Sequence, residues 1–156
     1  MIKRTTAVVR EWSKDGIRFC IAKAGLGHYC GYCTFPHRPV REHGYNGFME
    51  YVPVHGHITY AAVEQTGTTY GFDCAHAGDD EDPNCQDEQW VKVECERMAE
   101  AIKLAVVYEP AYLEAGTNEE KAAIIDAYHE QLREHGIEFC LTDNFGALIN
   151  VLGGYL

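Results

Sequence analysis

The sequence changes character near residue 85, and this change restricts the fold more than any other feature. Before it, short β-branched and aromatic runs alternate with Gly, Pro and Asp, which is typical of strands and turns. After it, apolar residues recur at the spacing of amphipathic helices. Strands followed by helices favour an α+β fold, in which an N-terminal antiparallel sheet is packed by C-terminal helices, over a doubly wound parallel sheet.

The expected strands lie in the first half of the chain. Residues 7–9 and 17–21 flank the turn signal Asp15-Gly16 and predict an opening hairpin. Further strands are expected at 28–35, 51–62 and 68–74, with an exposed loop rich in Gly, Pro, His and Arg at 38–47.

Two helices are expected in the second half. The first runs from Asp87 to about Tyr108 and ends at Glu109-Pro110, because proline cannot donate a backbone hydrogen bond. The second begins at a capping box and ends before a C-terminal glycine; these signals are Thr117 with Glu120, and Gly136. A short strand at 137–141 and a last helix at 144–152 complete the prediction.

Length and charge narrow the functional classes. The 156 residues fit a single domain, 1–156, in which a strand- and loop-rich half (1–85) carries the site and a helical half (86–156) follows. A formal net charge of −11 repels phosphate backbones, so we expect no binding to long DNA or RNA. A small anion remains a candidate ligand, because one arginine or a helix N-terminus suffices for it.

No segment predicts a membrane or export role. The chain has no apolar run near the ~20 residues of a membrane helix and no apolar signal-peptide core, so we expect a cytoplasmic protein with no membrane partner. Its seven cysteines are then expected to be core residues, metal ligands or reactive thiols rather than disulfides. The oligomeric state is open, a homo-oligomer included.

Three segments concentrate side chains capable of catalysis or metal binding, namely 27–33, 54–62 and 70–80. Glycines among these side chains let the backbone approach a ligand closely. His55 and His57 alternate with glycine, so on a strand both would face one side and could hold a metal or form an acid–base pair. Alternatively, one histidine ends a strand and the other is only exposed to solvent.

The third segment is the densest in candidate residues. Asp73 could orient a histidine as a triad carboxylate does, and His76 is a candidate for that histidine. Cys74 is better explained as a buried small hydrophobe than as a nucleophile. Asp79 and Asp80 offer oxygen ligands to a hard cation, although charge runs are usually solvated loops.

The C-x-x-C spacing of Cys30 and Cys33 leaves two interpretations open. Together with Cys74 and a histidine, His28 or His76, the pair would complete a structural zinc site. Alternatively, Cys30 would be an acyl-transfer nucleophile that acts with His55.

Residues 28–32, 54–61 and 71–79 carry the motifs HxCGY, VHGxxTYA and GFDCAHAGD in this order. They resemble an uncharacterised family of small proteins found largely in phages and prophages. The resemblance covers about the first half of the chain, implies a phage or prophage origin and hence a bacterial host cell, and marks as motif positions His55, Asp73, Cys74, His76 and Asp79. In this family the position of His57 is usually glycine.

A second similarity concerns a short motif. The sequence His57-Ile58-Thr59-Tyr60 is similar to the His-x-Ser/Thr signature of two-histidine phosphoesterases, which use it twice. The sequence His76-Ala77-Gly78 does not fit the second copy.

The preferred hypothesis is a small phage-type hydrolase that acts on a nucleotide-like phosphodiester, such as a host immune signal, in an anti-defence role. His55, Asp73 and His76 would be catalytic. Asp79 and His57 would hold a divalent metal ion, Zn, Mn or Mg. The residues expected to bind substrate are His28, Tyr29, Tyr32, Arg38, Tyr60 and Cys74.

Two alternatives stay open. The protein could be a nucleotide-signal binding protein without turnover, a sponge with a pocket lined by Tyr29, Tyr32, Tyr60 and Tyr70. It could also be an interaction protein stabilised by zinc.

Overall fold

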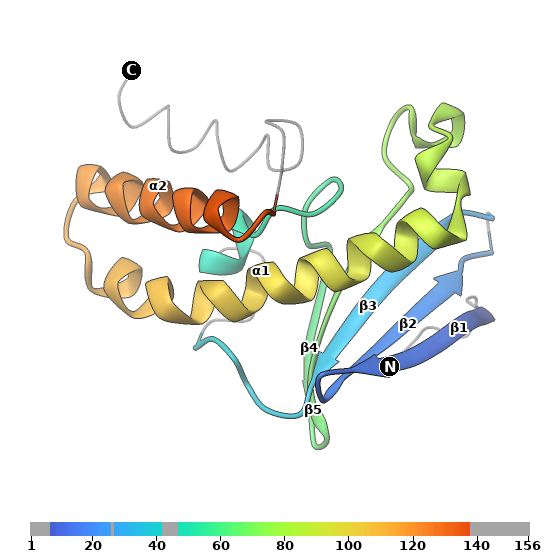
Figure 1. Cartoon of the computed structure of the whole chain (residues 1–156), viewed down its shortest axis with the longest axis horizontal. Helices are drawn as coiled ribbons and strands as arrows, with labels where there is room; N and C mark the ends of the chain where they lie inside the picture. Colours follow the sequence, from blue (N-terminus) through green and yellow to red (C-terminus); the bar gives the residue numbers. More distant parts are fainter. Residues whose placement is uncertain (1–6, 26, 42–46, 138–156) are drawn as a thin grey trace.

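The computed structural model of the chain describes residues 7–25, 27–41 and 47–137. Five strands form one antiparallel sheet in the order β1-β2-β3-β5-β4. Helix α1 crosses one face of this sheet, and α2 packs beside the part of α1 that extends past the sheet (Figure 1). The predicted α+β fold is therefore confirmed. The elements are β1 (Ala7–Lys14), β2 (Ile17–Lys23), β3 (Tyr29–Phe35), β4 (Tyr60–Glu64), β5 (Gly67–Asp73), α1 (Glu88–Glu114) and α2 (Asn118–Glu134).

The strand prediction is confirmed except between β3 and β4. The hairpin of β1 and β2 turns at Asp15-Gly16, as expected. The expected strand at 51–62 is wrong over its first part, because the chain forms the short 3-10 helix η1 (Phe48–Tyr51) and enters the sheet only at Tyr60. Pro53 lacks the amide hydrogen that a ladder requires, and Gly56 has a positive φ of 73°, so neither suits an extended strand here.

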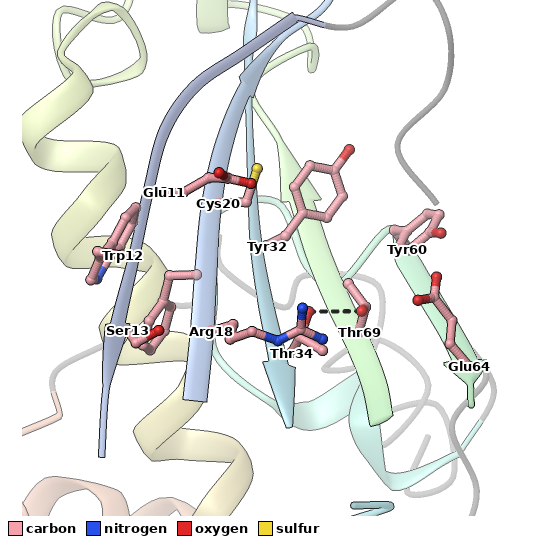
Figure 2. Close-up of a pocket in the computed structure, with 11 residues that line it drawn as sticks. Glu11, Trp12, Ser13, Arg18, Cys20, Tyr32, Thr34, Tyr60, Glu64 and Thr69 are labelled. Carbon is pink, nitrogen blue, oxygen red and sulfur yellow. Dashed lines mark hydrogen bonds between the residues drawn. The ribbon is translucent and has the colours of Figure 1, made fainter. Parts of the chain in front are cut away.

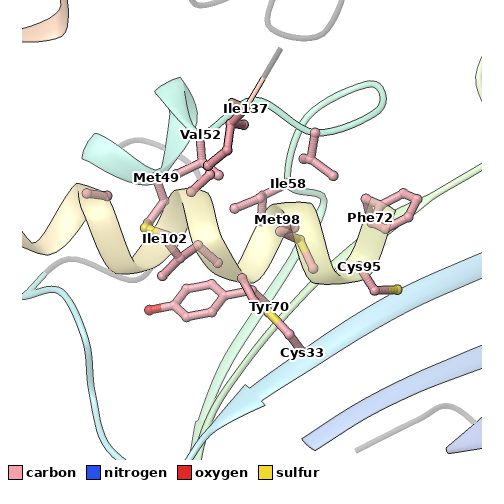
Figure 3. Packing of buried hydrophobic residues seen from close by; sticks show 14 of the residues in the cluster. Cys33, Met49, Val52, Ile58, Tyr70, Phe72, Cys95, Met98, Ile102 and Ile137 are labelled. Carbon is pink, nitrogen blue, oxygen red and sulfur yellow. The ribbon is translucent and has the colours of Figure 1, made fainter. Parts of the chain in front are cut away.

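The two faces of the sheet differ because side chains alternate along each strand. One face packs against α1 and forms the core (Figure 3), with side chains between 0% and 4% exposed from Phe19, Ile21, Cys33, Phe35, Tyr70 and Phe72. The opposite face carries more polar side chains, including Cys20, Tyr32, Thr34, Thr69 and Asp73. We call this second side the open face, because no helix among the described residues covers it.

The predicted end of the first helix is wrong, since α1 continues through Pro110 to Glu114. A proline inside a helix removes one backbone hydrogen bond. Tertiary packing holds the extra turn, because the Tyr112 ring lies 5.3 Å from Phe48 and 5.7 Å from Tyr51. The aromatic contacts therefore decide where the helix ends.

The predicted start of α2 is confirmed. Thr117 Oγ1 accepts a hydrogen bond from the Glu120 amide at 3.1 Å, which is half of the expected capping box. Tyr128 is fully buried and donates to the Ala101 carbonyl at 2.7 Å, so it fixes α2 against α1. No helix within the described ranges is long and apolar enough to cross a membrane.

Two further predictions fall largely outside the described residues. The strand at 137–141 is described only at Ile137, which is buried, and the helix at 144–152 is not described at all.

The loop at 38–47 was expected to be exposed, but Val40 within it is only 3% exposed. Residues 42–46 of that loop also lie outside the described ranges.

Gly31 allows α1 to approach β3 closely, and this contact can be tested. A Cβ atom at Gly31 would lie 2.5 Å from Cys95 Sγ and 2.6 Å from a Phe72 ring carbon. We expect Gly31→Ala to lower the free energy of unfolding by about 1–3 kcal/mol, as overpacking of a core does. The matched control is Gly116→Ala, where no atom lies within 4 Å, and urea unfolding of the two variants should separate them.

His129 predicts a loss of stability in mild acid. Burial lowers its pKa, as does nearby Arg133, although the hydrogen bond to the Tyr51 carbonyl and the charge of Asp126 oppose this. The unfolded chain therefore takes up the proton more readily, so this contribution to stability is present above the unfolded pKa of about 6.5 and is lost as the pH falls below it. Replacing His129 by Gln should reduce the difference in unfolding free energy between about pH 7.5 and about pH 5.5. An unchanged difference would contradict the assignment.

Candidate functional site

Asp79 links two imidazoles at one end of the sheet. Its Oδ1 lies 2.9 Å from His55 Nε2, and its Oδ2 lies 3.1 Å from His76 Nδ1. A carboxylate only accepts hydrogen bonds, so these two ring nitrogens are the donors. The ring centroids of His55 and His76 are 5.6 Å apart. Three of the residues singled out in the sequence therefore form one cluster, which we call the histidine–aspartate cluster.

The acidic loop after β5 is built around Asp79. The His76 amide donates to Asp79 Oδ2 at 2.8 Å, and the Asp79 amide donates to the His76 carbonyl at 3.0 Å. Gln86 donates to the Asp79 carbonyl at 3.2 Å and so ties the short helices η2 (Asp79–Glu81) and η3 (Asn84–Gln86) together. Asp79 is 5% exposed, whereas neighbouring Asp80 is exposed.

Helix α1 fixes the position of His55. Glu94 is 6% exposed and accepts from the His55 amide at 2.9 Å and from Arg97 Nη1 at 2.7 Å. Arg97 also donates to the Pro53 carbonyl at 3.3 Å. The Trp90 ring lies edge-on to His55, with centroids 5.6 Å apart. The loop before β4 is therefore attached to α1 at Pro53 and at His55.

Gly56 lets His76 pack against this loop. Its φ of 73° is favoured by glycine, and a Cβ atom there would clash with the His76 ring. The glycine between the two histidines of the 54–62 segment thus makes room for a third histidine.

The electrostatics keep Asp79 ionised. Burial raises the pKa of Asp79, but the hydrogen bonds from His55 and His76 together lower it more, so its pKa is below the usual range. The cluster therefore presents a negative charge between two imidazoles, which suits the binding of a cation.

Two buried cysteines lie on the other side of His55. Cys85 Sγ is 3.4 Å from His55 Nε2, and Cys74 and Cys85 are hydrogen-bonded to each other. Burial raises the pKa of Cys85 to about 12 and also raises that of Cys74. Without a metal both are protonated thiols near neutral pH and therefore poor nucleophiles.

These residues could hold a metal ion. Among the described residues there are two groups of three residues whose ligand atoms lie within 4.8 Å of one another. Both include His55; they are His55, His76 and Asp79, and His55, Cys74 and Cys85. His57 belongs to neither group, and it is exposed with a φ of 119°. Partial desolvation of the ring and the neighbouring His76 lower the pKa of His57, although Asp73 opposes this.

Asp73 lies beside the cluster. Its Oδ1 is 3.7 Å from His76 Nδ1 and accepts from the Ala75 amide at 3.1 Å. Asp79 makes the shorter contact with His76, so Asp79 and not Asp73 is the carboxylate that orients this histidine. The sequence had predicted Asp79 as a metal ligand. His28 precedes β3 at this same end of the sheet, where the Cys74 amide donates to the Tyr29 carbonyl.

A groove of about 480 Å³ lies on the open face (Figure 2). It has the size of a small-molecule site. Tyr32 and Tyr60 line it with their rings at right angles and 5.5 Å apart. The rest of the lining is mixed, with the aromatic residues Trp12 and Phe19 beside more polar residues, chiefly Glu11, Arg18, Cys20, Thr34, Glu64 and Thr69.

Other expected ligand-binding residues lie away from the groove. Tyr29 and Tyr70 are on the face that packs against α1, and Tyr70 is fully buried. Arg38 lies beyond Phe35, the last residue of β3, and so past the end of the strand that is remote from the cluster. This places it about 20 Å from Cys30 in the strand direction. There its guanidinium donates to the carbonyls of Val40 and Arg41. Arg18 is instead the arginine that lines the groove.

Cys30 and Cys33 do not share a site. Residues three apart on a strand point to opposite faces. Cys33 is fully buried against α1, whereas Cys30 lies opposite Asp73 on the open face. Burial raises the pKa of Cys30, and Asp73 raises it further against a hydrogen bond to Tyr32, so this thiol is not activated. The zinc site expected from the C-x-x-C spacing is therefore contradicted.

Cys85, Trp90 and Glu94 were not predicted from the sequence. Cys85 had a usable signal, because cysteine is among the most often buried residue types and is unexpected inside an acidic, proline-containing loop. Trp90 and Glu94 had none, since they lie on a helix at ordinary helical spacing.

Comparisons place no known protein beside this chain. No protein-family model, curated protein or solved structure matches it. The function therefore has to be argued from the site itself.

Asp79 can be tested as the organising residue of the cluster. Asp79→Asn removes the charge that three hydrogen bonds depend on, so we expect the unfolding free energy to fall by about 1.5–3 kcal/mol in the presence of a chelator. Asp80→Asn, an exposed neighbour, should change it by no more than about 0.5 kcal/mol. Equal effects in urea unfolding would show that Asp79 has no special role.

Proposed function

We propose that this protein is a metal-dependent hydrolase that cleaves a nucleotide-like phosphodiester. The observation that carries the proposal is the convergence of His55, His76 and Asp79, with further ligand atoms within reach of His55. A divalent ion at such a centre would lower the pKa of a water and offset charge developing on phosphate.

His76 is suited to proton transfer. Its Nδ1 donates a hydrogen bond to Asp79, so Nε2 is the ring nitrogen that remains for proton transfer. The His76 side chain is 33% exposed, against 20% for His55 and 8% for Asp79. It is therefore the member of the cluster that a substrate would meet first, held in orientation by a buried carboxylate as in other catalytic His–carboxylate pairs.

The groove supports a nucleotide-like substrate. Tyr32 pairs with Gly71 and Cys30 pairs with Asp73, so along the sheet Tyr32 lies about 7 Å from Asp73. Asp73 in turn lies 3.7 Å from His76 Nδ1. Aromatic rings stack on bases, so Tyr32 and Tyr60 fit the base of such a ligand. A base in the groove would place its phosphate toward His76.

Binding without turnover is the second candidate function. The same groove favours it, because Tyr32 and Tyr60 can retain a base whether or not the cluster acts on the phosphate. Recovery of intact ligand after heat denaturation of a complex would favour this function over hydrolysis. The phage origin and the anti-defence role remain proposals that rest on the motifs alone.

The hydrolase proposal predicts metal-dependent cleavage. The purified chain would be incubated with bis-p-nitrophenyl phosphate, cyclic dinucleotides and NAD-derived signals, each with Zn²⁺, Mn²⁺ or Mg²⁺. We expect cleavage of at least one compound, and His76→Ala should lower kcat by about 10²–10⁴ because it removes a general base. His135→Ala, at the end of α2, is the matched control and should retain activity. Intact substrates under every condition would overturn the proposal.

A further inference from the structure

Cys74, Cys85 and His55 form a set of ligands on the buried side of the cluster. They come from three places along the chain: the end of β5, helix η3 and the loop before β4. Cys74 is 2% exposed and Cys85 is fully buried, and the ligand atoms of the three residues lie within 4.8 Å of one another. Only His55 belongs to both groups of ligand atoms in the described part of the chain.

The spacing of these atoms fits a tetrahedral zinc ion. Zinc binds sulfur at about 2.3 Å and nitrogen at about 2.0 Å, which places neighbouring ligand atoms about 3.3–3.8 Å apart. The Cys85 Sγ to His55 Nε2 distance of 3.4 Å is within that range. The chain therefore needs little movement to bring these two ligands onto one ion.

Charge also favours thiolate ligands here. A divalent ion in buried surroundings needs compensating negative charge close to it. Two thiolates supply a charge of −2, whereas the other group has only the Asp79 carboxylate. The same pair of sulfur ligands selects zinc over magnesium or manganese, which prefer oxygen.

We infer that the metal of this protein is zinc, held by Cys74, Cys85 and His55. Nε2 of His55 then binds the ion through its lone pair instead of donating to Asp79, the ring proton is on Nδ1, and the two thiol protons are released to water. His76 is then outside the ligand set and keeps its bond to Asp79. Three protein ligands leave a fourth position for water or substrate, as in catalytic zinc sites. This inference rests on the proposed metal dependence, and it adds the identity of the ion and its ligands.

Other cysteines provide the comparison. Cys33 and Cys95 are equally buried, but they belong to no such group and pack in the apolar core beneath α1. Cys20 is partly exposed and lines the groove on the open face. A measured effect of Cys74 and Cys85 that Cys20 does not share is therefore specific to the proposed ligands.

The test is cobalt binding to the full chain after treatment with a chelator. Cobalt(II) substitutes for zinc and gives a strong near-ultraviolet charge-transfer band only when thiolates bind it. We expect this band to saturate at one cobalt per chain and to disappear when zinc is added. It should be lost in Cys85→Ser and in Cys74→Ser, and retained in Cys20→Ser.

The outcomes separate this inference from the proposed function. Cobalt binding without a charge-transfer band would overturn the thiolate ligands and leave a histidine–carboxylate metal site standing. No cobalt binding at all would overturn both. If the serine variants fail to fold, X-ray absorption at the zinc edge of the unmodified protein decides instead. There we expect two sulfur neighbours at about 2.3 Å, and a shell of only nitrogen and oxygen would overturn the inference.

Discussion

A carboxylate that is removed from water must be compensated by hydrogen bonds or by opposite charge. Asp79 meets this requirement by accepting hydrogen bonds from two imidazoles and one backbone amide. The same carboxylate therefore holds three groups of the surrounding loops in place. The His55 amide also donates to Glu94 of α1. A series of hydrogen bonds therefore connects the acidic loop to this helix. The geometry of the candidate site depends on this one buried charge more than on any strand or helix by itself.

The sheet has a buried face that packs against α1 and an open face that carries the groove. Alternation along β3 and β5 sends apolar side chains toward α1 and leaves Tyr32, Thr69 and Asp73 on the open face. The groove lies on the open face and includes Thr69 near the start of β5, whereas the cluster follows the other end of that strand, after Asp73. The groove and the cluster therefore do not compete for the same side chains.

The cluster also contains two kinds of ligand chemistry around one nitrogen. Toward solvent, His55 meets a carboxylate and a second imidazole, and toward the core it meets two thiols. One ring nitrogen can hold only one proton or one ion, so ligation on the buried side leaves the exposed imidazole available for proton transfer. A buried set of metal ligands beside an exposed base would suit the proposed hydrolysis.

The sequence by itself determined the elements whose signals are local. The turn at Asp15-Gly16, the cap at Thr117 and the order of strands before helices follow from neighbouring residues, because backbone geometry and side-chain period are set over a few positions. The two-residue period of a strand also predicts that Cys30 and Cys33 point in opposite directions. The C-x-x-C spacing was instead interpreted as a shared metal site. Only the tertiary structure decided that α1 passes Pro110, that Asp79 joins His55 to His76, and that Cys85 lies against His55. Those contacts bring together segments far apart in the chain, so they depend on the packing of the whole core and not on any local pattern.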